Sequence, residues 1–159
     1  MIKQANVAEQ TKQESKSLKQ DYVFAIGRRR SSTVEVRLYK SDATVWGNTT
    51  VKKGEIFVNN KPAVEYFGSV FEKVYRGPLQ TTNTENNFAV SIKAAGGGKM
   101  GQLDAAVLAI ARGLDKIDHD KFHSALKKRG MLTRDPRVRE RRKVGMGGKA
   151  RRKKQSPKR

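Results

Sequence analysis

Residues 87–114 read NFAVSIKAAGGGKMGQLDAAVLAIARGL, a strand pattern, three glycines and a helix pattern in direct succession. Apolar side chains occupy every second position of the strand pattern: Phe88, Val90 and Ile92. In the helix pattern they recur at intervals of three or four residues: Leu103, Val107, Ile110 and Leu114. These periods predict a strand with one buried face and then a core helix, which interspersed alanines keep slim enough to pack closely on a sheet.

Upstream of this unit, β-rich runs predict two half-buried strands over residues 22–26 and 33–39, and a short third strand over 55–58. In the second run, Val34, Val36 and Leu38 alternate with Glu35, Arg37 and Tyr39, which we expect to point outward.

Two further helices are predicted on either side of this unit. Residues 63–79 have mostly helical spacing, interrupted at Gly68 and ended by Gly77-Pro78. Another helix is predicted over residues 120–128, ending near Gly130. Strands and helices interleave without a regular βα repeat, so the sequence predicts an α+β fold with helices packed against one sheet.

Composition divides the 159 residues into three parts. Residues 1–20 contain few apolar side chains and no aromatic one, which predicts a flexible N-terminal leader. Residues 21–133 hold all the periodic segments and are expected to form the single α+β core domain. Residues 134–159 contain thirteen Lys and Arg side chains against two acids, without apolar periodicity, which predicts an extended basic tail that cannot fold alone.

The charge of the whole chain indicates its partner. The formal net charge is +20, from 35 Lys and Arg side chains against 15 acids, which favours a protein that works beside a polyanion such as nucleic acid. No apolar run approaches the ~18 residues of a transmembrane helix, so a membrane partner is not expected. The absence of cysteine excludes thiolate chemistry and disulfides, and no secretory h-region is visible, so a cytoplasmic location is expected.

The basic tail is the main candidate for RNA binding, because clustered Arg and Lys neutralise phosphates and release counterions. A solvated tail or a localisation signal is the alternative. The tail residues expected to bind RNA are Arg134, Arg137, Arg139, Arg141, Arg142, Lys143, Lys149, Arg151, Arg152, Lys153 and Lys154.

Two shorter motifs in the core domain are further candidates. Arg28, Arg29 and Arg30 follow the first strand and can dock phosphate, although such a cluster can also be a plain solvated turn. The glycines at 96–98, with Lys99, match G-x-G-x-x-G but lack the context of a dinucleotide site or a P-loop. A turn that permits close packing and an RNA-backbone contact made by its N–H groups and Lys99 remain equal alternatives.

Catalytic and metal-binding motifs find little support. His119 and His123 have the i, i+4 spacing of a zinc pair, but no third ligand is apparent, so surface histidines without a metal are expected. No Ser-His-Asp or paired-carboxylate arrangement has supporting context. The sequence therefore predicts a protein that is not an enzyme and carries no cofactor.

Several ordered motifs together closely resemble the family of the ninth protein of the bacterial small ribosomal subunit. The resemblance spans roughly residues 22–159, with a connection over 41–53, including Trp46, that is longer than usual. The motifs are GRRRSSTVEVRL at 27–38, GEIFVNN at 54–60, EYF at 65–67, the glycines at 96–98, GQ at 101–102, IAR at 110–112, LTRDPR at 132–137, ERRK at 140–143, KARR at 149–152 and the terminal KR.

This resemblance implies a structural constituent of the small ribosomal subunit that supports translation. It implies a core like the second domain of the fifth small-subunit protein, with a left-handed βαβ crossover. It also implies binding to small-subunit rRNA in the head, neighbouring ribosomal proteins as partners, and a tail whose Lys158 and Arg159 approach the anticodon region of peptidyl-site tRNA. The alternative is a nucleoid or histone-like DNA-binding protein, although no reading helix or dimer arm is visible.

Overall fold

The computed structural model of the chain describes residues 22–45, 49–142 and 144, and shows one α+β domain, as predicted. The strands of its five-stranded sheet lie in the order β1 (Tyr22–Arg29), β2 (Ser32–Tyr39), β7 (Ala89–Ala95), β5 (Ile56–Val58) and β6 (Lys61–Pro62). A separate hairpin pairs β3 (Ala43–Val45) with β4 (Thr49–Val51). The helices are α2 (Ala63–Phe67), the 3-10 turn η1 (Ser69–Phe71), α3 (Glu72–Thr81), α4 (Lys99–Ile117) and α5 (His119–Lys128).

The sheet mixes two strand directions. β1, β2 and β7 pair antiparallel, whereas β5 lies parallel to β7. Parallel neighbours need a crossover connection, which α2, η1 and α3 supply between β5 and β7. The βαβ crossover implied by the resemblance is therefore present, and its left-handed sense stays a prediction.

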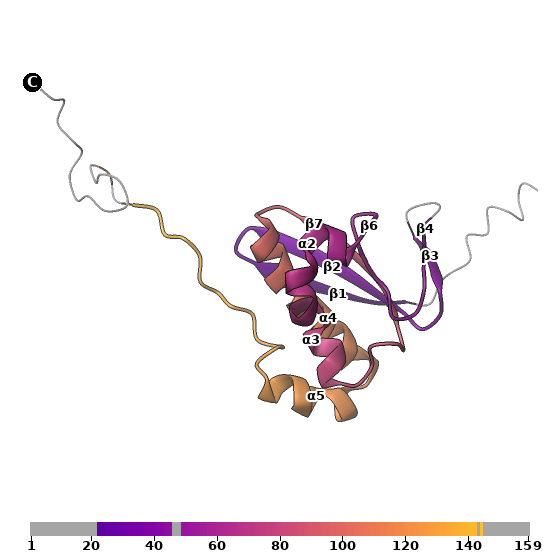
Figure 1. Cartoon of the computed structure of the whole chain (residues 1–159). Coiled ribbons are helices and arrows are strands. Elements are labelled where there is room, and N and C mark those ends of the chain that lie inside the picture. Colours follow the sequence, from indigo (N-terminus) through magenta and orange to yellow (C-terminus); the bar gives the residue numbers. More distant parts are fainter. Residues whose placement is uncertain (1–21, 46–48, 143, 145–159) are drawn as a thin grey trace, which may run out of the picture.

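The main core lies between the sheet and the helices (Figure 1). The expected alternation along β2 is found, since Val34, Val36 and Leu38 are fully buried. They meet a stripe of α4 that includes Leu103 and Ile110. Burial of this stripe accounts for the long, alanine-rich helix that the sequence predicts.

A smaller apolar cluster is formed with the β3–β4 hairpin. Tyr39, Ala43, Val51 and Ala89 are buried together, with Phe57 against them. Tyr39 was expected to point outward, but it is only 3% exposed because this cluster covers it. The long connection thus forms a hairpin over the sheet, and Trp46 lies outside the described residues.

The predicted helix end at Gly77-Pro78 is wrong, because α3 continues through both residues to Thr81. Gly77 has no Cβ to clash with the proline ring, so it tolerates the helical conformation before proline. Pro78 and Leu79 are buried, and this packing favours continuation of the helix. The predicted last helix is confirmed as α5, which Asp118 caps at its start.

α4 lies unusually close to the first two strands. A Cβ on Gly27 of β1 would be 1.9 Å from the carbonyl oxygen of Ala105, and one on Gly113 would be 2.6 Å from Leu38 Cδ1. Helix backbone and strand backbone are therefore in direct contact at Gly27. Residues 134–142 leave this packed domain as an extended segment without regular secondary structure (Figure 1).

In the part of the chain that the structure describes, no helix combines the length and the hydrophobicity that crossing a bilayer requires.

We expect Gly27→Ala to destabilise the domain by about 3 kcal/mol or more, because the new methyl group meets backbone atoms that no rotamer change can move. Gly98→Ser is the control, since nothing lies within 4 Å of its Cβ position and serine is a favoured N-cap for α4. Urea unfolding of both variants measures the difference, and equal stabilities would contradict the close contact.

Candidate nucleic-acid interface

The predicted arginine cluster lies at the turn between β1 and β2: β1 continues through Arg28 and Arg29, and Arg30 begins the turn itself. We call these three residues the arginine turn. Arg29 pairs with Ser32 across the two strands, which leaves Arg30 and Ser31 as the two turn residues. Arg30 has a left-handed φ of 52°, a conformation that costs a non-glycine residue free energy. The side chains of Arg28 and Arg30 are exposed, so this rigid turn holds two guanidinium groups toward solvent.

The glycine turn before α4 packs against this arginine turn. A Cβ on Gly97 would lie 2.1 Å from Ser32 Oγ, and one on Gly96 would lie 2.6 Å from the Ser31 carbonyl oxygen. Both glycines also have positive φ angles, so the close-packing alternative for this motif has direct support. The exposed Lys99 consequently begins α4 at the same end of the domain as the arginine turn.

The third arginine of the turn, Arg29, holds the start of the tail. Its guanidinium Nη2 lies 2.9 Å from Oδ2 of Asp135, and its Nη1 donates to the carbonyl oxygen of Arg137 at 2.9 Å. Its Nε also lies 3.5 Å from a carboxylate oxygen of Asp104 on α4. With a side chain only 11% exposed, Arg29 joins strand, helix and tail, an arrangement that we call the Arg29 clasp.

Asp135 lies at the centre of the clasp. Its carboxylate accepts hydrogen bonds from the Arg137 side chain and from the Arg137 backbone amide. These bonds, together with the charges of Arg137 and Arg29, lower the pKa of Asp135 far below its ordinary value. The aspartate is therefore ionised at neutral pH and keeps two arginines in place.

A groove of about 520 Å³ opens where the tail leaves the domain. The residues that line it come from both predicted basic segments: Arg30, Arg137, Val138, Arg139, Glu140 and Arg142. The structure thus brings together the arginine turn and the first part of the tail, which lie more than 100 residues apart in sequence. We call this end of the domain, with Arg28, Arg30, Lys99 and residues 134–142, the basic end.

The structure describes only the first part of the predicted basic tail. The predicted tail residues that lie outside the described residues are Lys143, Lys149, Arg151, Arg152, Lys153, Lys154, Lys158 and Arg159. Among the described ones, Arg134, Arg139 and Arg141 are exposed.

Two positively charged side chains of α4 have a structural role that the sequence reasoning missed. Nη1 of Arg112 donates to the carbonyl oxygen of Ile26 at 3.1 Å, and Nζ of Lys116 donates to that of Phe24 at 2.9 Å. Both carbonyls belong to β1, which is one of the two edge strands of the sheet. An edge carbonyl left without a partner invites pairing with another chain, so these cations protect the edge. Their four-residue spacing on one helix is the signal that could have indicated a shared partner.

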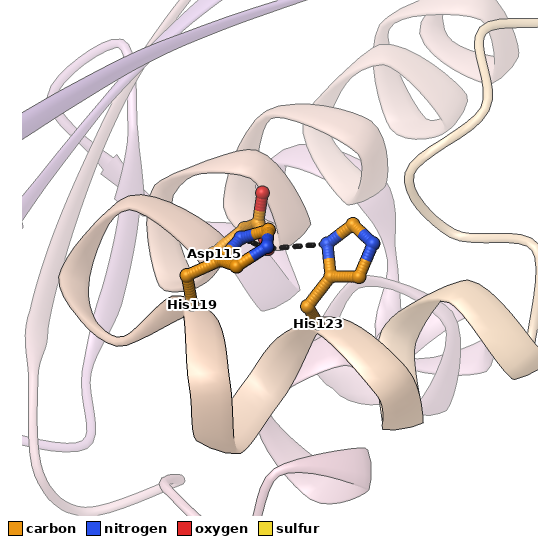
Figure 2. Close-up of side chains that lie close together, drawn as sticks. All are labelled: Asp115, His119 and His123. Carbon is orange, nitrogen blue, oxygen red and sulfur yellow. Dashed lines mark hydrogen bonds and ion pairs between the residues drawn. The ribbon is translucent and has the colours of Figure 1, made fainter.

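The structure places a candidate third ligand beside the two histidines, which the sequence reasoning did not identify. Asp115, on the last turns of α4, lies with His119 and His123 of α5 in one cluster (Figure 2). Its Oδ1 atom is 3.1 Å from Nδ1 of His119 and 2.9 Å from Nδ1 of His123. The sequence search missed Asp115 because it sits on the preceding helix, four residues before the first histidine.

The described residues define a class of protein, one α+β domain with a cationic arm that is fixed to its sheet. A family model described as ribosomal protein S9/S16 matches residues 27–159. The small ribosomal subunit protein uS9c of Mesostigma viride is 42% identical over 76% of this chain and 80% of its own length. Protein uS9 of Christiangramia forsetii is 41% identical over 87% and 99%, and uS9 of Crocosphaera subtropica is 38% identical over 77% and 82%.

The chain therefore belongs to the ribosomal protein S9/S16 family. This family is structural and non-enzymatic, so the predicted lack of enzymatic activity agrees with it. Membership also confirms the expected role as a constituent of the small ribosomal subunit in translation and the expected location in ribosomes.

We expect Asp135→Asn to release the start of the tail, because the uncharged amide no longer holds Arg29 and Arg137 together. The {1H}-15N heteronuclear NOE of the backbone amides of residues 136–141 should fall, while the core amides keep their values. Glu65→Gln removes the same charge from an exposed pair with Lys61 and should change none of them. Unchanged NOE values in the Asp135 variant would show that the clasp does not fix the tail.

Proposed function

We propose that the protein binds small-subunit rRNA through its basic end and its tail, and that the tip of the tail contacts peptidyl-site tRNA. The observation that carries this proposal is the convergence of separate basic segments on one end of the domain. Arg28 and Arg30 on the arginine turn, Lys99 at the start of α4 and the groove at the root of the tail all lie there.

The mounting of these cations suits phosphate recognition. Arginines on a tight turn keep a fixed separation, so they lose little conformational entropy when two phosphates bind. Each guanidinium offers a planar fork of donors to a phosphate, and it can also stack on an exposed base of single-stranded RNA.

Arg29 contributes to RNA binding only indirectly in this proposal, by positioning the tail. Its guanidinium already has the carboxylates of Asp104 and Asp135 as partners, and a phosphate would have to compete with both. We therefore assign Arg29 to holding the tail in position, and the exposed arginines beside it to RNA. The fixed direction of residues 134–142 then sets the path along which the later cations meet the RNA.

The tip of the tail has the greatest reach. Extended at about 3.3 Å per residue, residues 134–159 span on the order of 80 Å, far beyond the domain that carries them. The earlier cations anchor the tail on rRNA in the head of the subunit, and Lys158 and Arg159 at its end meet the anticodon region of the tRNA. Neighbouring small-subunit proteins are the remaining expected partners.

The alternative of a nucleoid protein receives no support from the relatives described above, which are small ribosomal subunit proteins.

Binding to small-subunit rRNA should weaken steeply with salt, by roughly 10³–10⁵ between 50 and 200 mM if about 6–10 phosphates are neutralised. Replacing Arg28 and Arg30 by glutamine should lower the slope of log K against log salt by about 2, and a chain ending at Thr133 should lower it much further. Fluorescence anisotropy with a labelled rRNA fragment measures these slopes.

The matched control for this experiment replaces Lys52 and Lys53, two exposed lysines after β4, by glutamine. It removes the same charge from the segment that follows the β3–β4 hairpin, which lies away from the basic end (Figure 1). If both double variants change the slope equally, net charge alone governs binding and the basic end is not the interface.

Removal of Lys158 and Arg159 should weaken tRNA binding to the peptidyl site of purified subunits while the subunits still assemble. Two charge-assisted contacts are lost, each worth at most about 1.5–3 kcal/mol before competition with solvent. Filter binding of tRNA to subunits that carry the protein ending at Pro157 measures the effect. The control Lys153→Gln with Lys154→Gln removes two cations from within the tail, and an equal loss of tRNA affinity there would contradict a special role of the tip.

A further inference from the structure

A second cluster of ionisable side chains lies at the far end of α4 from the basic end, where α5 begins (Figure 2). It consists of Asp115 on α4 and of His119 and His123, one turn apart on α5. We propose that these three side chains bind a divalent transition metal ion, with Zn²⁺ as the ion that suits the donors best. This site is separate from the residues assigned to RNA.

The spacing of the donor atoms fits such an ion. Zinc takes imidazole nitrogens and carboxylate oxygens at about 2.0–2.2 Å in tetrahedral geometry, which places neighbouring donors about 3.3 Å apart. Oδ1 of Asp115 lies 3.1 Å and 2.9 Å from the Nδ1 atoms of the two histidines, and all three donor atoms lie within 4.8 Å of one another. The two carboxylate–imidazole distances are therefore slightly shorter than in a zinc site, and small side-chain rotations would open them to admit the ion.

The backbone already places both rings correctly. His119 and His123 are on the same face of α5, and their rings lie side by side with centroids 4.2 Å apart. Nδ1 of each ring lies within hydrogen-bond distance of the same carboxylate oxygen, and Figure 2 shows the bond to His123 as a dashed line. An ion bound between these atoms would take the place of the two hydrogen bonds, without a change in the fold.

The cations nearest in sequence do not oppose a metal. Lys121 is engaged by Asp118, with Nζ 2.9 Å from a carboxylate oxygen. Lys116 is directed to the Phe24 carbonyl oxygen on β1. Neither lysine therefore competes for the carboxylate of Asp115, which stays available to the histidines and to a bound ion.

Three protein donors leave a coordination position for water or an outside ligand, as in open zinc sites. His119 has a side chain 64% exposed, so the ion can enter from solvent. A bound ion would tie α5 to α4 and add its binding free energy to the stability of the domain.

The composition of the chain makes the test unusually clear. His119 and His123 are the only histidines of all 159 residues, and there is no cysteine. Isothermal titration of the untagged full chain with ZnCl₂ should show one saturable site, and the melting temperature should rise with zinc. Asp115→Asn and His119→Gln should each weaken binding at least tenfold and abolish most of the rise in melting temperature.

Asp120→Asn is the control, because it removes the same charge from the first turn of α5 outside the cluster, and it should bind zinc like the wild type. His119→Gln tests the site without risk to the fold, since this side chain is mostly exposed. Absence of saturable binding by the wild type, or equal affinity after replacement of both histidines by glutamine, would overturn the proposal and leave only a hydrogen-bonded cluster.

Discussion

The contact between the backbone of α4 and the first strand is the constraint on which the rest of the domain depends. It exists because Gly27 has no side chain and because α4 presents alanine at Ala105 and Ala109 on the facing surface. Even one added methyl group would force the helix outward. The helix would then carry Asp104 away from Arg29, and Arg112 away from the edge carbonyl of β1. Packing of small residues in the core thus determines the position of charged residues at the surface.

Although the chain has a net charge of +20, two acidic side chains lie next to its most basic segment, and the position of Arg29 explains why. Asp104 and Asp135 weaken the positive potential that RNA would meet, but they hold Arg29 between strand, helix and tail. An arm fixed at its root approaches a partner from one direction, whereas a freely jointed arm must lose that freedom on binding. The two aspartates therefore reduce the electrostatic attraction of this end of the domain for a polyanion, but they fix the direction in which the tail leaves it.

Much of the fold was predictable from sequence because its core uses regular periods. The alternation of Val34, Val36 and Leu38 and the α4 stripe of Leu103, Ile110 and Leu114 gave the right elements and buried faces, whereas Val107 of that stripe is only partly buried. The helix through Pro78 was missed because tertiary burial overrode a local breaker signal. The Arg29 clasp could not be predicted, since Asp135 lies 106 positions away in sequence and only the tertiary fold brings the two together. In the same way Asp115 joins the histidines only because the chain turns between α4 and α5.

The structure also sorts the described cations in a way that composition could not. Arg29, Arg112 and Lys116 are engaged by carboxylates or carbonyls of the protein itself, so a phosphate gains little by displacing those partners. Arg28 and Arg30, by contrast, stand exposed on a rigid turn. A phosphate that binds them replaces only water, and the release of counterions favours the exchange. Position in the fold, more than the number of positive charges, therefore separates the cations that maintain the domain from those that stay exposed to solvent.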